Sequence, residues 1–86
     1  MITTRIIENV KQIAADVFGI KIEEITMRSS TDSIETWDSL QHLVFVLALE
    51  QYYSLQFEPD EIEQMKSIEI TIMTIEEKLL SKGIVL

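Results

Sequence analysis

Residues 36–53 read TWDSLQHLVFVLALEQYY and join a polar loop to a largely apolar run. Asp38 and Gln41 have the spacing of a capping box, in which the carboxylate accepts first-turn N–H groups and the glutamine bonds back to the cap. We therefore predict a helix from about Ser39 to Tyr53, with Ser39 as its first residue. A helix N-terminus carries unpaired N–H groups and a partial positive charge, so a phosphate ester on Ser39 would lie in a favourable field.

The predicted helix is apolar on more than one face. Its residues form two stripes at helical spacing, one of His42, Phe45, Val46, Leu49 and Tyr53 and one of Leu40, Val44, Leu47 and Gln51. One stripe can serve the core, so Val44 and Leu47 are either further core residues or contacts for a partner. For Trp37 we favour a packing anchor between the loop and the bundle over a partner contact, and we expect His42 to lie on the helix surface or to be half-buried.

Three further helices are predicted from apolar spacing and from residues typical of helix ends. The first helix, with Thr3 or Thr4 as its cap, ends near residue 18, because Gly19 follows an apolar stripe of Ile6, Val10, Ile13, Ala14, Val17 and Phe18. A short third helix begins at Pro59, behind Glu58, and ends near Lys66. Residues 68–72 alternate as a strand would, but the longer helical spacing through Leu79 and the glycine at 83 favour a fourth helix that starts after Ser67.

Between the first two helices, residues 20–36 lose the helical pattern. We expect a long ordered loop that is pinned to the bundle by Ile20, Ile22, Ile25 and Ile34. Loops of this length are uncommon in small domains and tend to be functional. With 86 residues, one proline and two glycines, the chain is predicted to be a single all-α domain over residues 1–86, an antiparallel four-helix bundle with a short third helix.

Composition excludes several classes of function. Fifteen acidic and seven basic residues give a net charge of −8, which disfavours nucleic acid and anionic membrane surfaces as partners. The absence of cysteine excludes disulfides, and one histidine without cysteine gives no metal-binding pattern. No signal-peptide pattern and no run of transmembrane length occurs, so we expect a cytoplasmic protein without membrane insertion.

The chain resembles the acyl carrier proteins and the related peptidyl carrier domains. The resemblance covers nearly the whole chain and rests on Asp38-Ser39-Leu40 at the start of the second helix, Leu49-Glu50, the loop segment Glu23–Thr26 and the helix start Glu58–Glu61. It implies an acyl-carrier bundle in which Ser39 carries 4'-phosphopantetheine, added from coenzyme A by a phosphopantetheinyl transferase. The resemblance also implies that Asp38 caps the helix and helps to orient the transferase's metal. Leu40 would lie beside the 4'-phosphopantetheine arm as a contact for partners.

As a member of that family the chain would perform no chemistry itself. It would hold acyl or aminoacyl groups as thioesters for a loading enzyme and for a downstream transferase or synthase, as a monomer by default. Because the chain has no cysteine, the thiol would have to come from the prosthetic group. Trp37, Val44, Leu47 and Glu50 are the predicted partner contacts.

Two departures from the common family pattern narrow the expected role. Thr36 stands where many carriers have glycine, and Trp37 precedes the aspartate, a variant that resembles stand-alone carriers of specialised biosynthetic pathways. Between Ser39 and Phe57 the only acidic residue is Glu50, and Val44 and Leu47 stand where acids are expected. We therefore expect partners to recognise this helix mainly through apolar contacts. The negative charge for recognition would come from acidic residues outside it: Glu35, Asp38, Glu58, Asp60, Glu61 and Glu63.

Two other interpretations of the sequence are kept open. An unmodified carrier-like adaptor would bind a partner through the second helix without using Ser39 for attachment. A hydrolase would use Ser39 with His42, one turn later, as nucleophile and base, but no third orienting group is evident and the chain is too small for a substrate cleft.

Overall fold

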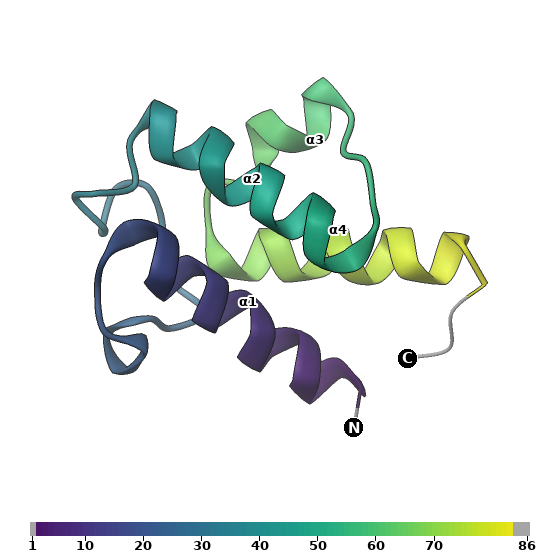
Figure 1. The fold of residues 1–86 in the computed structure, drawn as a ribbon, viewed down its shortest axis with the longest axis horizontal. Coiled ribbons are helices and arrows are strands. Elements are labelled where there is room, and N and C mark those ends of the chain that lie inside the picture. Colours follow the sequence, from purple (N-terminus) through teal and green to yellow (C-terminus); the bar gives the residue numbers. More distant parts are fainter. Residues whose placement is uncertain (1, 84–86) are drawn as a thin grey trace.

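The computed structural model describes residues 2–83 of the chain. Within them the elements are α1 (Ile2–Phe18), the 3₁₀ helix η1 (Ile22–Glu24), α2 (Ser39–Tyr53), α3 (Pro59–Gln64) and α4 (Ile68–Ser81). In Figure 1, α1 runs opposite to α2 and α4, and the short α3 lies beside α2 before the chain returns into α4. The predicted all-α four-helix bundle is confirmed, with α2 and α4 running in the same direction.

The α1 helix buries the apolar face that its spacing predicted. Ile6, Val10, Ala14 and Phe18 are all buried. The helix ends at Phe18 because Gly19 has a φ of 68°, in the left-handed region that glycine enters without strain. The expected cap at Thr3 or Thr4 is wrong, because the helix already begins at Ile2 and both threonines lie inside it.

The fourth segment forms a helix and not a strand. The hydroxyl oxygen of Ser67 accepts a hydrogen bond from the Ile70 N–H at 3.2 Å, so Ser67 caps α4. Ile68, Ile72, Ile75 and Leu79 face the core at helical spacing. Gly83 has a φ of 83° just beyond the last turn, as its predicted place at the helix end requires.

The α3 helix has only six residues and ends at Gln64, two residues before the predicted end. It is joined to α4 by an ion pair of 2.8 Å between Lys78 Nζ and Glu61 Oε1. Burial alone would raise the pKa of the Glu61 carboxyl, but hydrogen bonds from Lys78 and from the backbone of Glu58, and the charge of Lys78, lower the pKa below its usual value. Glu61 therefore serves the fold and is not a free surface charge.

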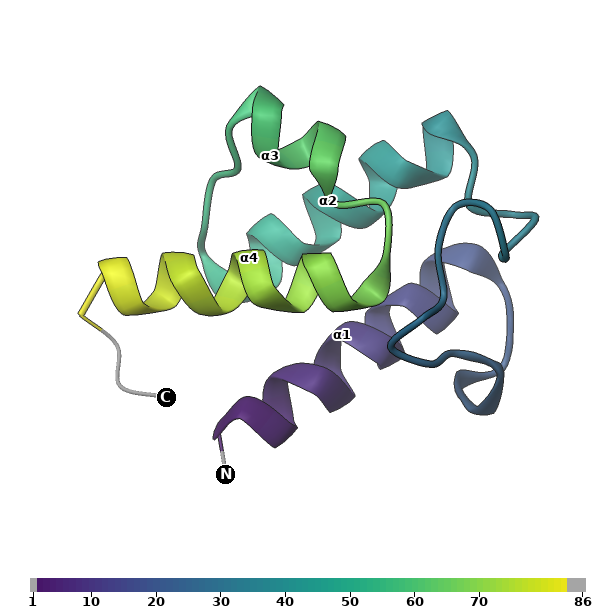
Figure 2. The ribbon, with the colours of Figure 1, turned by 180° about the vertical axis from the view of Figure 1, so that it is seen from behind.

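The long loop between α1 and α2 is ordered by backbone pairing with the turn before α4. The Thr31 N–H donates to the Lys66 carbonyl at 3.0 Å, and the Ile68 N–H donates to the Ser29 carbonyl at 2.9 Å. Ile25 and Ile34 are buried, and Ile20 and Ile22 are partly buried against the core, which confirms the four predicted pinning residues. Figure 2 shows the loop beside the start of α4 from behind.

An aromatic cluster closes the end of the core next to the start of α2. The Trp37 ring stacks on Phe18 with centroids 4.7 Å apart and meets Phe45 edge-on at 5.5 Å. Burying a large apolar side chain of this kind stabilises a fold by about 1.5–3 kcal/mol. The hydroxyl of Thr36 donates to the Phe18 carbonyl at 2.8 Å and so joins the loop to the last turn of α1.

Candidate functional site

The start of α2 is fixed by its cap. Asp38 has extended backbone angles, and its carboxylate Oδ1 accepts a hydrogen bond from the Gln41 N–H at 2.8 Å. The cap is therefore formed as predicted. The Asp38 N–H does not donate to the Gln41 side chain, so only one of the two bonds of the predicted capping box is formed. The carboxylate alone stabilises the first turn.

We expect replacement of this cap to weaken the fold measurably. Asp38→Ala should lower the free energy of unfolding by about 0.5–2 kcal/mol, because a first-turn N–H loses its acceptor. Urea denaturation followed by circular dichroism would measure the loss. Asp38→Asn keeps a capping oxygen and should recover most of the stability; equal losses in the two variants would contradict a capping role.

Ser39 is the first residue of α2, and its side chain is exposed to solvent. The helix behind it has 15 residues, so the partial positive charge of its N-terminus lies at Ser39. An anion esterified to this hydroxyl would be stabilised by the unpaired N–H groups of the first turn. Exposure leaves the hydroxyl open to a modifying enzyme.

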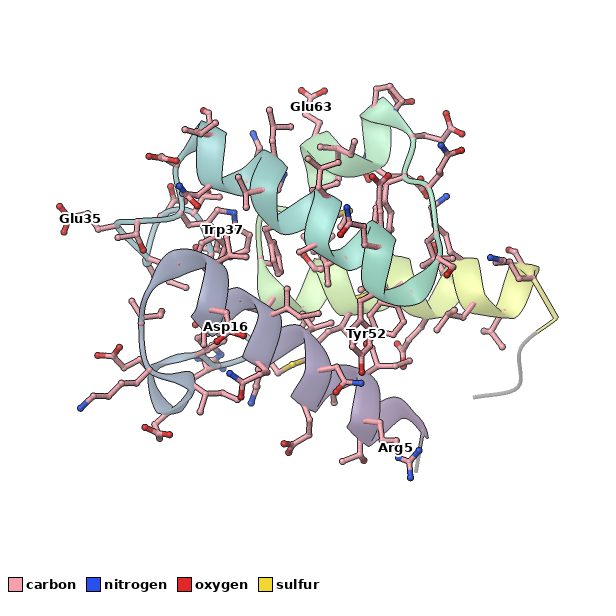
Figure 3. The ribbon with its side chains drawn as sticks, viewed as in Figure 1. Arg5, Asp16, Glu35, Trp37, Tyr52 and Glu63 are labelled. Atoms are coloured by element: carbon pink, nitrogen blue, oxygen red, sulfur yellow. The ribbon has the colours of Figure 1, made fainter. Side chains whose placement is uncertain are left out.

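A shallow hollow of about 520 Å³ lies beside Ser39. Its walls come from Ser39, His42 and Leu43 of α2, from Glu63 of α3, and from Lys66 in the turn before α4. Figure 3 shows Glu63 on α3, pointing away from the bundle. A larger hollow of about 650 Å³ lies at the other end of α2, between Ser54 and Lys82, and does not include Ser39. The smaller hollow is the one that can serve a group attached at the start of α2.

Trp37 precedes the cap and is only 2% exposed. Its indole lies among the rings of the core, between the end of α1 and the start of α2 in Figure 3. The packing interpretation is therefore confirmed. The alternative assignment of Trp37 as a direct partner contact is wrong, because almost none of its surface reaches solvent.

His42 is more deeply placed than its expected surface or half-buried position. It is 9% exposed, and its Nδ1 accepts a hydrogen bond from the Trp37 indole N–H at 3.0 Å. Its Nε2 lies 2.7 Å from the Ile62 carbonyl oxygen of α3. Both ring nitrogens are thus hydrogen-bonded to groups other than Ser39, so neither is placed to act as the base for its hydroxyl. This overturns the interpretation of Ser39 and His42 as a nucleophile and its base.

The outer face of α2 carries exposed apolar residues. Leu40 is 67% exposed and Leu47 57%, and Leu43 and Val44 are also exposed. Of the two interpretations kept open for Val44 and Leu47, the core interpretation is therefore wrong. Surface stripes of this kind often mark contacts with other proteins.

Glu50 has a structural contact that the sequence did not reveal. Its Oε2 accepts a hydrogen bond from the Phe57 N–H at 2.9 Å, which holds the segment between α2 and α3 against the end of α2. The side chain is partly buried. Glu50 therefore has a structural role in addition to its predicted role as a partner contact.

Comparison with known proteins bears on what this site does. No protein-family model matches the chain. The acyl carrier protein of Coprothermobacter proteolyticus is 30% identical over 78 residues, which cover 91% of this chain and 95% of that protein. The chain belongs to the acyl carrier protein family. The acyl carrier protein of Petrotoga mobilis is likewise 30% identical over 80 residues, covering 92% of this chain and 93% of that carrier.

Solved structures of acyl carrier proteins share the fold. The solution NMR structure of a holo acyl carrier protein from Geobacter metallireducens superposes with a TM-score of 0.78 at 26% identity, covering 88% of this chain and 87% of that one. The acyl carrier protein of Clostridium acetobutylicum is 35% identical over 63 residues, covering 73% of this chain and 82% of that protein. Family membership therefore rests on sequence and on the arrangement of the helices.

Three features of the site were not predicted from the sequence: the burial of His42, its bond to Ile62 and the place of Lys66 beside Ser39. The burial of His42 was detectable in principle, because His42 shares a stripe with Phe45, Val46 and Leu49. Its bond to Ile62 was not, because the two residues lie 20 positions apart. The place of Lys66 beside Ser39 was also hidden, since it depends on the pairing of Thr31 with the turn before α4.

Proposed function

We propose that this member of the acyl carrier family is modified on Ser39 and tethers acyl or aminoacyl groups as thioesters on a 4'-phosphopantetheine arm. The observation that carries the proposal is the exposed hydroxyl of Ser39 at the capped start of a 15-residue helix. The Geobacter metallireducens carrier with the same fold is a holo protein, which supports the same attachment here. No residue of this chain is assigned a catalytic role.

The residues around Ser39 fit a phosphodiester. Ser39 supplies an accessible oxygen, the N-terminus of α2 favours negative charge, and Lys66 places a cation on the wall of the adjoining hollow. The bound group supplies the thiol that a chain without cysteine lacks. Asp38 orients the first turn, and we assign its second carboxylate oxygen to orienting the transferase's metal. Leu40, the most exposed large apolar residue on α2, lies beside the attachment point.

The partners that we propose are a phosphopantetheinyl transferase, a loading enzyme and a downstream transferase or synthase. A tethered thioester is presented to each of them at high effective concentration. The exposed apolar stripe of Leu40, Leu43, Val44 and Leu47 supports partners that recognise α2 by apolar contact, together with Glu50. Trp37 precedes the aspartate, and Glu50 is the only acidic residue of α2. Both features support a role in a specialised biosynthetic pathway rather than in general fatty acid synthesis.

Modification can be tested directly. Incubation with coenzyme A and a broad-specificity phosphopantetheinyl transferase should add one phosphopantetheine to the intact mass of the folded chain. A folded wild-type chain that gains no mass, while another carrier is modified in the same reaction, would overturn the proposal.

A second candidate function is an unmodified adaptor that binds its partner through α2. The exposed stripe on α2 is the observation that favours it. This alternative requires that the wild-type chain gains no phosphopantetheine and that Ser39→Ala leaves partner binding unchanged.

The apolar stripe itself can be tested with the transferase as the partner. Val44→Asp or Leu47→Asp should raise the KM of the transferase for the carrier by about tenfold, because an exposed apolar contact becomes a desolvated charge. Met73→Asp, an equally exposed apolar position on α4, is the matched control and should leave KM unchanged. Equal effects at Leu47 and Met73 would show that recognition does not use this face.

A further inference from the structure

His42 joins three parts of the fold around the attachment site. The ring belongs to α2, accepts from the indole of Trp37 in the loop, and contacts the carbonyl of Ile62 in α3. The imidazole also lies in a stacked arrangement with the Trp37 ring, with centroids 6.0 Å apart. Trp37 directly precedes Asp38 and Ser39, so a change at its indole acts next to the cap and to the attachment point.

The two bonds define the protonation state of the ring. A carbonyl oxygen only accepts, so Nε2 must carry the hydrogen that faces Ile62. An indole N–H only donates, so Nδ1 must present its lone pair to Trp37. The contacts therefore require a neutral imidazole with its proton on Nε2.

Protonation would break only one of the two hydrogen bonds of the His42 ring, the one to Trp37. A second proton on Nδ1 would turn that nitrogen into a donor facing the indole N–H, and two donors cannot bond each other. The bond from Nε2 to Ile62 would remain. Trp37 is held between Phe18 and Phe45. When its hydrogen bond to His42 is lost, either the His42 ring or the loop that leads into Ser39 would therefore have to move.

Other charged groups line the same hollow as His42. Asp38 from the cap, Glu63 from α3 and Lys66 from the turn before α4 all line the hollow that contains His42. An unperturbed histidine side chain changes charge between about pH 5 and pH 8.

We propose that neutral His42 is a positioning residue for the attachment site, and that its protonation breaks the hydrogen bond to the Trp37 indole and loosens the start of α2 at Asp38 and Ser39. This inference rests on the proposed modification of Ser39 for its functional consequence. The structural coupling between the imidazole, the indole and the cap does not depend on it.

The coupling is testable by NMR on the unmodified protein, because the chain has one tryptophan and one histidine. The indole N–H resonance of Trp37 and the amide resonances of Asp38 and Ser39 should follow the same titration curve as the His42 ring protons. In His42→Asn the curve should vanish. A His42 ring that titrates while the indole and the Ser39 amide stay unchanged would overturn the proposal.

Two variants separate the two bonds of the imidazole. His42→Asn places an oxygen near the position of Nδ1 and keeps an acceptor for Trp37, whereas His42→Gln places an amide N–H near Nε2 and keeps a donor for Ile62. The glutamine variant therefore has the contacts of the protonated ring. Both are uncharged, so neither should show the titration.

The functional consequence is measured as the rate of Ser39 modification relative to His42→Asn, because this ratio removes the transferase's own pH dependence. For the wild type the ratio should fall by about two- to tenfold on acidification, the range expected for one lost hydrogen bond. For His42→Gln it should be low at every pH. A wild-type ratio that does not change with pH would overturn the positioning role. If none of the variants is modified, the proposed attachment at Ser39 is overturned, and the NMR titration alone tests the coupling between His42, Trp37 and the cap.

Discussion

Ser39→Ala should abolish the addition of phosphopantetheine while leaving the fold intact. The side chain is exposed at the first position of α2, and Asp38 rather than Ser39 caps the helix, so its removal should change the free energy of unfolding by no more than about 0.5 kcal/mol. Modification, by contrast, requires the serine oxygen as the atom that forms the phosphoester. Intact mass after incubation with coenzyme A and the transferase measures the first effect, and urea denaturation measures the second.

Ser81 offers a matched control for this prediction. It is an exposed serine at the last position of α4, where the partial charge of the helix end is negative rather than positive. Ser81→Ala should be modified at the wild-type rate. If Ser39→Ala still gained the adduct, attachment at Ser39 would be refuted; if it also unfolded, the loss of modification would no longer report on the hydroxyl.

Trp37→Ala should lower the free energy of unfolding by about 3–5 kcal/mol, the usual range for a buried tryptophan. The side chain is 2% exposed, and its removal takes away the stacking on Phe18 and the edge contact with Phe45. It also leaves Nδ1 of His42 without its donor. A domain of 86 residues has a total stability of only about 4–13 kcal/mol, so this single change can unfold much of the population.

Circular dichroism in urea measures this loss without relying on the removed fluorophore. Trp37→Phe keeps an aromatic ring for the stack but not the indole N–H, and it should lose clearly less stability than Trp37→Ala. Tyr52→Ala, at an exposed position of α2, serves as the second control and should fall within about 0.5 kcal/mol of the wild type. A loss below about 1 kcal/mol in Trp37→Ala would contradict the role of Trp37 as a core anchor.

Local signals in the sequence were sufficient to place the helices. Asp38 before an apolar run marked the start of α2 at Ser39, and its end at Tyr53 was also predicted. Gly19 marked the end of α1 because a positive φ is needed there. The choice of helix over strand after Ser67 was correct because helical spacing persisted to Leu79, far beyond the short alternation of isoleucines.

Contacts between distant segments could not be predicted from local signals in the sequence. Nothing near His42 in the sequence indicates that its ring bonds to Ile62, and only the folded chain brings α3 to that side of α2. Glu50 was assigned to partners because its bond to Phe57 spans a loop whose path was unknown. The misplaced cap on α1 has a simpler cause, since two consecutive threonines fit the cap position as well as the first turn.

Site-resolved mass spectrometry of the modified wild-type chain can show whether Ser39 is the attachment point. After reaction with coenzyme A and the transferase, proteolysis and fragmentation should locate one phosphopantetheine on Ser39 and none on the other exposed serines, Ser33, Ser54 and Ser81. An unmodified chain, or an adduct on any of those three serines instead, would refute attachment at Ser39.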